Sequence, residues 1–198
     1  MTETMFQPGY IGNVKLKNRI IMAPMGGFMM TADKNVSDTE IRYFAERAKG
    51  GVGLIFQAGL ASTKARILAH NVYLDDDAKL PMLNVMTRTV HSYGCKMGMM
   101  LGLGMGKTFR TREGELPKSP SPMPLMLEPD TLSEALTTEE IYEILADYSH
   151  AALIAYRAGY DMVHIQGYGA YLIDQFMSEK WNCRTDEFGG SFENRMRF

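Results

Sequence analysis

The stretch YDMVHIQGYGAYLIDQF at residues 160–176, followed by NCRTDEFGGSFENR at residues 182–195, decides the fold of this chain. It opens with residues 160–166, a short apolar run that is typical of a buried strand. Residues 193–198 then begin a helix. The stretch is therefore one strand–loop–helix unit, and its place in the fold depends on the units before it.

Three similar units precede this stretch. Apolar runs predict buried strands at residues 18–24, 52–58 and 96–101. The first of these strands ends at a proline, which favours a loop from that point onward. With the strand at 160–166, the chain contains four predicted strands, each followed by a helical segment.

Hydroxyl side chains followed three residues later by glutamate predict where two helices begin. Ser37 with Glu40 is one such capping box, and Thr137 with Glu140 is the other. Between them, residues 80–92 carry apolar side chains at helical spacing. Glycines predict where the three helices end, namely at Gly50, Gly94 and Gly159.

Alternating strands and helices predict an α/β fold with a parallel sheet. Two architectures have this order, a doubly wound open sheet and the first half of a (β/α)₈ barrel. No Gly-x-Gly-x-x-Gly opens a helix directly after the first strand, which weakens the dinucleotide-binding interpretation. Spacing alone leaves both architectures open.

Composition excludes several classes of protein. The chain has 198 residues, with 21 Lys and Arg against 23 Asp and Glu, and this balance argues against a nucleic-acid partner. Only Cys95 and Cys183 are present, too few for a disulfide framework or a Cys-rich metal site, so no metal is expected. No signal peptide or apolar run of membrane-spanning length is apparent. We therefore expect a cytoplasmic protein with reduced thiols that does not enter a membrane.

The loop after the third strand has an unusual composition. Glycines at 102, 104 and 106 suit a backbone that approaches a flat or anionic ligand, or a merely flexible loop. Residues 107–135 mix five prolines with charges, which predicts an irregular surface excursion rather than a separate domain.

Residues 166–176 and 182–195 resemble the old yellow enzyme family, the NADH:flavin oxidoreductases. The run Arg-Thr-Asp-x-x-Gly-Gly-Ser-x-x-Asn-Arg at 184–195 is specific to that family, and residues 16–25 and 47–55 are also similar. The resemblance implies that residues 1–198 form one partial FMN-binding domain, the first four β/α units of a (β/α)₈ TIM barrel. It places FMN at the C-terminal mouth of the strands.

The same resemblance implies roles for individual residues. The backbone of Pro24, Met25 and Gly26 matches the end of the first strand, which meets the flavin. Ala58 matches a small residue that lets the isoalloxazine approach. Tyr171 matches the tyrosine that gives a proton to the substrate, and a phenol suits that role because hydride addition to an electron-poor alkene builds carbanion character.

Several positions depart from the family pattern or are less specific. Phe28 matches an aromatic residue that lines the substrate pocket. Gln166 and Gly169 stand where the family has a histidine pair, or His then Asn, that grips the substrate oxygen. Gln166 keeps a donor amide, but Gly169 has no side chain. Met100 stands where a glutamine bonds the flavin, and a thioether lacks the paired donor and acceptor of an amide. His164 is expected to be a structural histidine with its hydrogen bonds satisfied.

Two functions follow from the resemblance and its departures. One is an FMN-dependent reductase, or a piece of one, that takes hydride from NAD(P)H and passes it to a small activated alkene. Family members that contain an iron–sulfur cluster carry it further along the chain, so no iron–sulfur cluster is expected in residues 1–198. The other is a non-catalytic half-barrel that binds no flavin. Because a half-barrel exposes strand edges, we also expect a homo-oligomer or a complementary half-barrel chain.

Overall fold

The computed structural model describes residues 2–26, 29–62, 71–103 and 114–198. Phe28, the glycines at 104 and 106 and part of the 107–135 excursion lie outside these residues. The described residues form two compact units. The first contains residues 2–26, 29–60, 71–101 and 150–164, and the second contains residues 61–62, 102–103, 114–149 and 165–198. The helices and strands are α1 (Thr2–Phe6), β1 (Gly9–Ile11), β2 (Val14–Leu16), β3 (Ile21–Met22), α2 (Asp38–Lys49), β4 (Leu54–Leu60), β5 (Val72–Tyr73), a 3₁₀ turn (Asp77–Lys79), α3 (Leu80–His91), β6 (Lys96–Gly102), β7 (Lys118–Ser119), β8 (Glu134–Ala135), α4 (Thr138–Arg157), β9 (Met162–Ile165), α5 (Leu172–Met177) and α6 (Phe192–Arg195).

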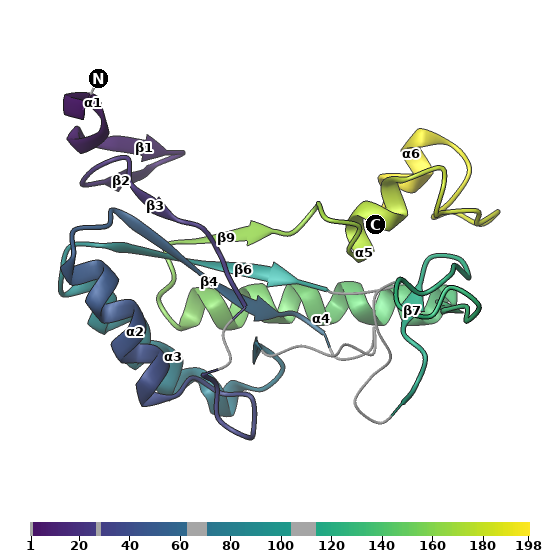
Figure 1. The fold of residues 1–198 in the computed structure, drawn as a ribbon, viewed down its shortest axis with the longest axis horizontal. Coiled ribbons are helices and arrows are strands. Elements are labelled where there is room, and N and C mark those ends of the chain that lie inside the picture. Colours follow the sequence, from purple (N-terminus) through teal and green to yellow (C-terminus); the bar gives the residue numbers. More distant parts are fainter. Residues whose placement is uncertain (1, 27–28, 63–70, 104–113) are drawn as a thin grey trace. The chain divides into compact units, whose positions relative to one another are not determined.

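The main sheet has the strand order β3-β4-β6-β9 (Figure 1). β3 pairs in parallel with the start of β4, where Ile21 lies opposite Leu54. β5 pairs in parallel with the end of β4, where Val72 lies opposite Gly59. The alternation of strand and helix therefore gives the predicted parallel sheet, although β3 and β9 are shorter than the apolar runs at 18–24 and 160–166.

Helices α2 and α3 lie side by side against the main sheet (Figure 1). Their buried side chains repeat at three- and four-residue spacing, which places them on one face of each helix. The two helices that the spacing of apolar residues predicts are therefore confirmed. The fully or nearly fully buried apolar side chains of the two helices are Ile41, Phe44, Ala48, Leu83, Met86 and Val90.

The two predicted capping boxes form to different extents. Thr137 accepts a hydrogen bond from Glu140 N at 3.2 Å, and Glu140 accepts one from Thr137 N at 2.9 Å, so both halves of that box are present. Ser37 accepts from Glu40 N at 3.2 Å, but the Glu40 side chain does not return the bond. The second half of the Ser37 box was therefore wrongly predicted, because Glu40 is buried and faces another partner.

That partner belongs to a buried polar chain that crosses from α2 to the sheet. Gln57 on β4 donates from Nε2 to Glu40 Oε1 at 3.0 Å, and the Tyr160 hydroxyl donates to Gln57 Oε1. Gln57 is 0% exposed and Glu40 3%. Glu40 Oε2 has no hydrogen-bond partner among the described residues. Burial raises the pKa of Glu40 above its usual 4.5, and it raises the pKa of Tyr160 well above 10.

Replacing Glu40 by glutamine should change how stability depends on pH. The native state holds the Glu40 proton more tightly than the unfolded chain, so the stabilising contribution is full below pH 4.5 and is lost as pH rises through the raised native pKa. At its steepest, this loss approaches roughly 1 kcal/mol per pH unit. Glu40→Gln mimics the protonated side chain and should lack the decline. Urea denaturation of both proteins between pH 4 and 8 measures this decline in the free energy of unfolding.

Glu46→Gln is the matched control, because Glu46 lies exposed on the same helix. Its profile should follow the wild type. If Glu40→Gln also follows the wild type at every pH, the buried carboxyl does not ionise with an altered pKa.

A second polar cluster fixes the amino ends of β6 and β9. Asp161 Oδ1 accepts from Lys96 Nζ at 2.7 Å, and its Oδ2 accepts from Met97 N at 2.9 Å and lies 2.7 Å from His91 Nε2. Despite the opposing effect of burial, these hydrogen bonds lower the pKa of Asp161. The end of α3 and the starts of two strands are thus held by one carboxylate.

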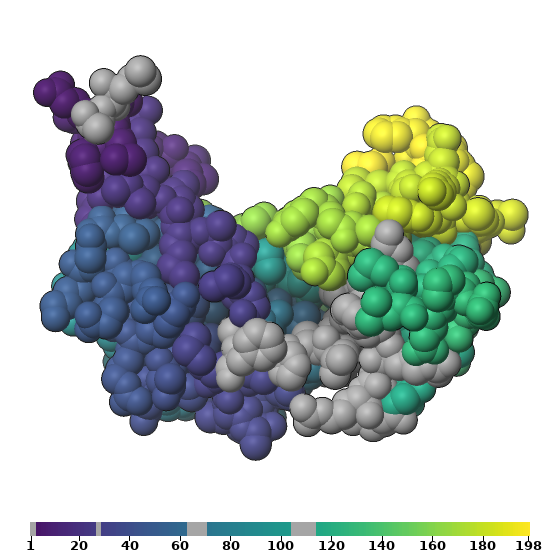
Figure 2. All heavy atoms as spheres, in the orientation of Figure 1, coloured from purple at the N-terminus to yellow at the C-terminus, as the bar shows by residue number. Residues whose placement is uncertain are grey.

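Several short elements were not predicted from periodicity. α1 and the antiparallel hairpin β1–β2 protrude at the N-terminal end of the first unit (Figure 2), with Phe6 and Tyr10 largely exposed. In the second unit, the described part of the 107–135 excursion is more regular than expected. β7 and β8 pair in parallel, and Pro124 bridges Leu132.

Candidate functional site

The predicted flavin-facing residues of the first unit lie at the carboxyl ends of neighbouring parallel strands. Pro24, Met25 and Gly26 follow β3, Ala58 lies near the end of β4, and Met100 lies near the end of β6. Ala58 and Met100 are buried, whereas Met25 is 63% exposed. Carboxyl ends of parallel strands share one edge of a sheet, which is where ligands of α/β proteins bind.

The backbone at Gly26 meets a polar side chain that sequence reasoning missed. A Cβ placed on Gly26 would lie only 3.1 Å from Oδ1 of Asn71. This oxygen is buried and has no hydrogen-bond partner among the described residues. A bare backbone beside an unsatisfied acceptor fits a flat group that carries hydrogen-bond donors, as a flavin does. Nothing in the sequence near Asn71 signals this placement.

The predicted substrate-facing residues of the second unit lie between β9 and α5. Gln166 follows β9 directly and is buried. Gly169 has φ +77°, and a Cβ on it would lie 3.1 Å from Cε2 of the Tyr171 ring. A histidine at 169 would therefore have to displace the Tyr171 ring. In this chain the Tyr171 ring packs directly against the Gly169 backbone.

Tyr171 is held by a strained turn. Ala170 has φ +58°, which is unfavourable for a residue with a Cβ. Two side chains of α5 hold this conformation, since Asp174 Oδ2 accepts from Ala170 N at 2.7 Å and Gln175 Nε2 donates to Ala170 O at 2.6 Å. Tyr171 itself is the N-cap residue of α5 and is half-buried. Its position is thus set by its neighbours on both sides.

His164 differs from the sequence-based expectation. Its ring makes an edge contact with Phe56, at 5.2 Å between ring centroids, so it packs within the first unit as expected. Its Nδ1, however, is buried and has no hydrogen-bond partner among the described residues. The prediction that the hydrogen bonds of His164 are satisfied was therefore wrong for this nitrogen.

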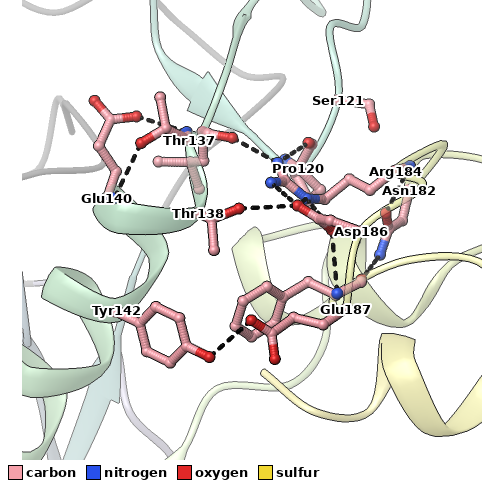
Figure 3. Close-up of polar contacts among 12 residues, drawn as sticks. Pro120, Ser121, Thr137, Thr138, Glu140, Tyr142, Asn182, Arg184, Asp186 and Glu187 are labelled. Atoms are coloured by element: carbon pink, nitrogen blue, oxygen red, sulfur yellow. Dashed lines mark hydrogen bonds and ion pairs between the residues drawn. The ribbon is translucent and has the colours of Figure 1, made fainter.

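The family-specific run at 184–195 has a structural role within the second unit (Figure 3). Arg184 donates from Nη1 to the carbonyls of Pro120 and Leu136, at 2.9 and 2.5 Å, and from Nε to Asp186 at 3.0 Å. Asp186 also accepts from Thr138 Oγ1 at 3.1 Å. The Arg184 side chain lowers the pKa of Asp186 to about 2. This run therefore holds the proline-rich excursion and the start of α4 together.

The rest of that run caps and anchors α6. A Cβ on Gly189 would lie 2.2 Å from Arg184 O, so only glycine allows this approach. Ser191 caps α6 by accepting from Asn194 N at 3.2 Å. Arg195 is largely buried and donates from Nε to Met177 O at 3.0 Å. None of these contacts involves Tyr171, so we assign the run to structure.

The described residues also bear on metal binding and on membrane insertion. Across these residues, no three His, Cys, Asp or Glu side chains are grouped so as to hold a metal ion. Among the helices in this part of the chain, none has the length and apolar character needed to cross a membrane. Cys95 and Cys183 are both free thiols, as expected.

Two similar curated relatives are an NADH oxidase and a cinnamate reductase. NADH oxidase of Thermoanaerobacter brockii is 39% identical over 197 residues, which cover 98% of this chain and 30% of that protein. Cinnamate reductase of Clostridium sporogenes is 36% identical over 213 residues, which cover 99% of this chain and 31% of that protein. The chain therefore spans about a third of the length of these relatives.

Solved structures settle the choice between the two predicted architectures. Old yellow enzyme from Pichia sp. AKU4542 has a TM-score of 0.85 at 28% identity, covering 98% of this chain and 53% of that one. Morphinone reductase in complex with tetrahydroNAD has a TM-score of 0.84 at 30% identity, covering 98% and 57%. The α/β fold with its parallel sheet matches the N-terminal half of these TIM barrels, not a doubly wound sheet.

A sequence model of one family covers nearly the whole chain. The model described as the NADH:flavin oxidoreductase / NADH oxidase family matches residues 4–198. This confirms the family resemblance of residues 166–176 and 182–195. The chain belongs to the NADH:flavin oxidoreductase / NADH oxidase family of flavin oxidoreductases.

Proposed function

We propose that this chain provides the flavin-facing and proton-donating residues of an FMN-dependent ene reductase. The observation that carries the proposal is the bare backbone of Gly26, beside an unsatisfied amide oxygen, at the carboxyl edge of the parallel sheet. Membership of a flavin oxidoreductase family supports it. When bound, FMN supplies the two-electron chemistry, taking hydride from NAD(P)H and giving it to an activated alkene.

The residues that would hold FMN come from neighbouring strand ends. Backbone groups of Pro24, Met25 and Gly26 face the ring, and the small side chain of Ala58 leaves room for it. Met100 offers an apolar thioether where an amide would bond the ring, so contact there is by packing. Gln166 follows β9 directly, and the family resemblance assigns its amide to the cofactor or the substrate.

Tyr171 is the proposed proton donor. Hydride adds to one carbon of the alkene, and the Tyr171 hydroxyl protonates the other, after which solvent restores the phenol. The strained turn at Ala170 supports this role, because backbone strain is retained where a side chain must be held in place. Because Gly169 has no side chain, Gln166 is the one residue of the pair 166 and 169 that can donate a hydrogen bond to the substrate oxygen. This weaker activation suits alkenes that are already strongly electron-poor.

Binding of FMN by the full chain tests the proposal. Titrating the protein with FMN should quench flavin fluorescence to a 1:1 endpoint and yield a yellow protein. Anaerobic NADH or NADPH should then bleach the flavin absorbance, and an added activated alkene should restore it.

A colourless protein that takes up no FMN would contradict the proposal and favour the non-catalytic half-barrel. A yellow protein whose reduced flavin no electron-poor alkene reoxidises would retain the cofactor but remove the substrate class. Assembly as a homo-oligomer or with a complementary half-barrel stays a prediction, and light scattering of the flavin-loaded protein measures it.

A further inference from the structure

Asn71 is fixed at the carboxyl end of β4 by the backbone that follows it. Val72 pairs with Gly59, and Leu74 N donates to Leu60 O at 2.9 Å. Tyr73 N donates to Lys34 O at 3.0 Å. Asn71 comes one residue before Val72, as Ala58 comes one residue before Gly59, so the register carries Asn71 alongside Ala58.

The Asn71 amide also faces the end of β3. Its Oδ1 would be 3.1 Å from a Cβ on Gly26, whereas the next nearest side-chain atom, Cγ, would be 4.0 Å away. The oxygen is therefore the part of the side chain that points at the Gly26 backbone. Gly26, Ala58 and Asn71 form one corner of the sheet edge, and two of the three are already proposed to face the flavin.

An unpartnered buried amide oxygen at this corner is costly. Burying a polar atom without a hydrogen bond destabilises a protein, and the great majority of buried oxygens have a partner. Asn71 Oδ1 has none among the described residues. An acceptor in this state is suited to a ligand that brings an N–H or O–H group, and poorly suited to a phosphate, whose oxygens are acceptors at neutral pH.

We propose that Asn71 is a further flavin-binding residue, whose Oδ1 accepts a hydrogen bond from an N–H or hydroxyl group of the isoalloxazine or ribityl part of FMN. The inference rests on the proposed function, since it takes FMN as the ligand. It adds a side-chain contact from the segment before β5, which the sequence did not indicate. Because the phosphate is not involved, Asn71 should contribute equally to the binding of FMN and of riboflavin.

Asn71→Leu tests the contact, because leucine has a similar size and no acceptor. In the full chain, we expect fluorescence titration to show about five- to tenfold weaker binding of both FMN and riboflavin. Asn71→Asp retains an acceptor and should restore most of the affinity. The melting temperature of the flavin-free Asn71→Leu protein should equal or exceed that of the wild type, because the unsatisfied oxygen is gone.

Asn84→Leu is the matched control, since Asn84 lies on α3 and its amide donates to Leu80 O at 3.0 Å. It should leave both flavin affinities unchanged. Affinities of Asn71→Leu within twofold of wild type would overturn the Asn71 contact while leaving the proposed function intact. A flavin-free Asn71→Leu protein that melts several degrees lower would show a structural role instead. Wild-type protein that binds neither flavin would overturn both.

Discussion

Replacing Arg184 by alanine is expected to destabilise the second unit by about 1.5–3 kcal/mol, the usual contribution of hydrogen bonds made by a charged group. The Arg184 side chain is only 10% exposed. Its loss leaves the carbonyls of Pro120 and Leu136 without their donor and leaves Asp186 with neutral donors alone. Urea denaturation followed by circular dichroism measures the loss.

Two further variants separate charge from geometry. Arg184→Lys keeps the positive charge beside Asp186 but lacks the planar fork that also reaches the two carbonyls, so we expect an intermediate loss. Arg197→Ala is the control, since Arg197 is exposed and its Nε donates to Glu187 O at 2.9 Å. It should cost under about 1 kcal/mol. A stable Arg184→Ala protein, within about 0.5 kcal/mol of the wild type, would remove the structural role of the run.

Replacing Tyr171 by phenylalanine is expected to slow alkene reduction by about 10²- to 10⁴-fold, the range for loss of a general acid. The ring of Tyr171 packs on Gly169, and phenylalanine preserves that contact. Flavin reduction by NAD(P)H needs no proton from Tyr171 and should proceed at the wild-type rate. Stopped-flow measurement of the two half-reactions separates them.

Tyr168→Phe is the matched control, because Tyr168 is 57% exposed in the same loop. It should leave both half-reactions unchanged. Equal slowing of both half-reactions in Tyr171→Phe would show that the tyrosine supports flavin binding and does not donate the proton. Unchanged alkene reduction would assign the proton to solvent or to another residue.

Local signals in the sequence predicted the helices well and the short elements poorly. The bounds of α2 and α3 follow Ser37, Gly50 and the apolar spacing closely, because caps and periodicity involve residues within a few positions of one another. α5 has six residues and opens without a side-chain cap, so no pattern indicated it. Hairpin β1–β2 is likewise too short for alternation to be read.

The candidate site was predicted as single residues, and its local geometry was not. Gly169 was interpreted as the loss of a histidine, whereas its backbone supports the Tyr171 ring. The orphaned oxygen of Asn71 depends on Gly26, which lies 45 positions away in the chain. Contacts at that separation have no local sequence signal.

The sequence by itself determined the order of strands and helices, the first and last residues of the capped helices, and the family. Each of these depends on residues that lie close together along the chain. Only the tertiary structure decided that Glu40 turns from its capping box to Gln57, that Arg184 bonds carbonyls 48 and 64 residues away, and that Asn71 is left with an unsatisfied oxygen. These outcomes depend on burial, which makes a buried polar group take the partner that packing brings to it.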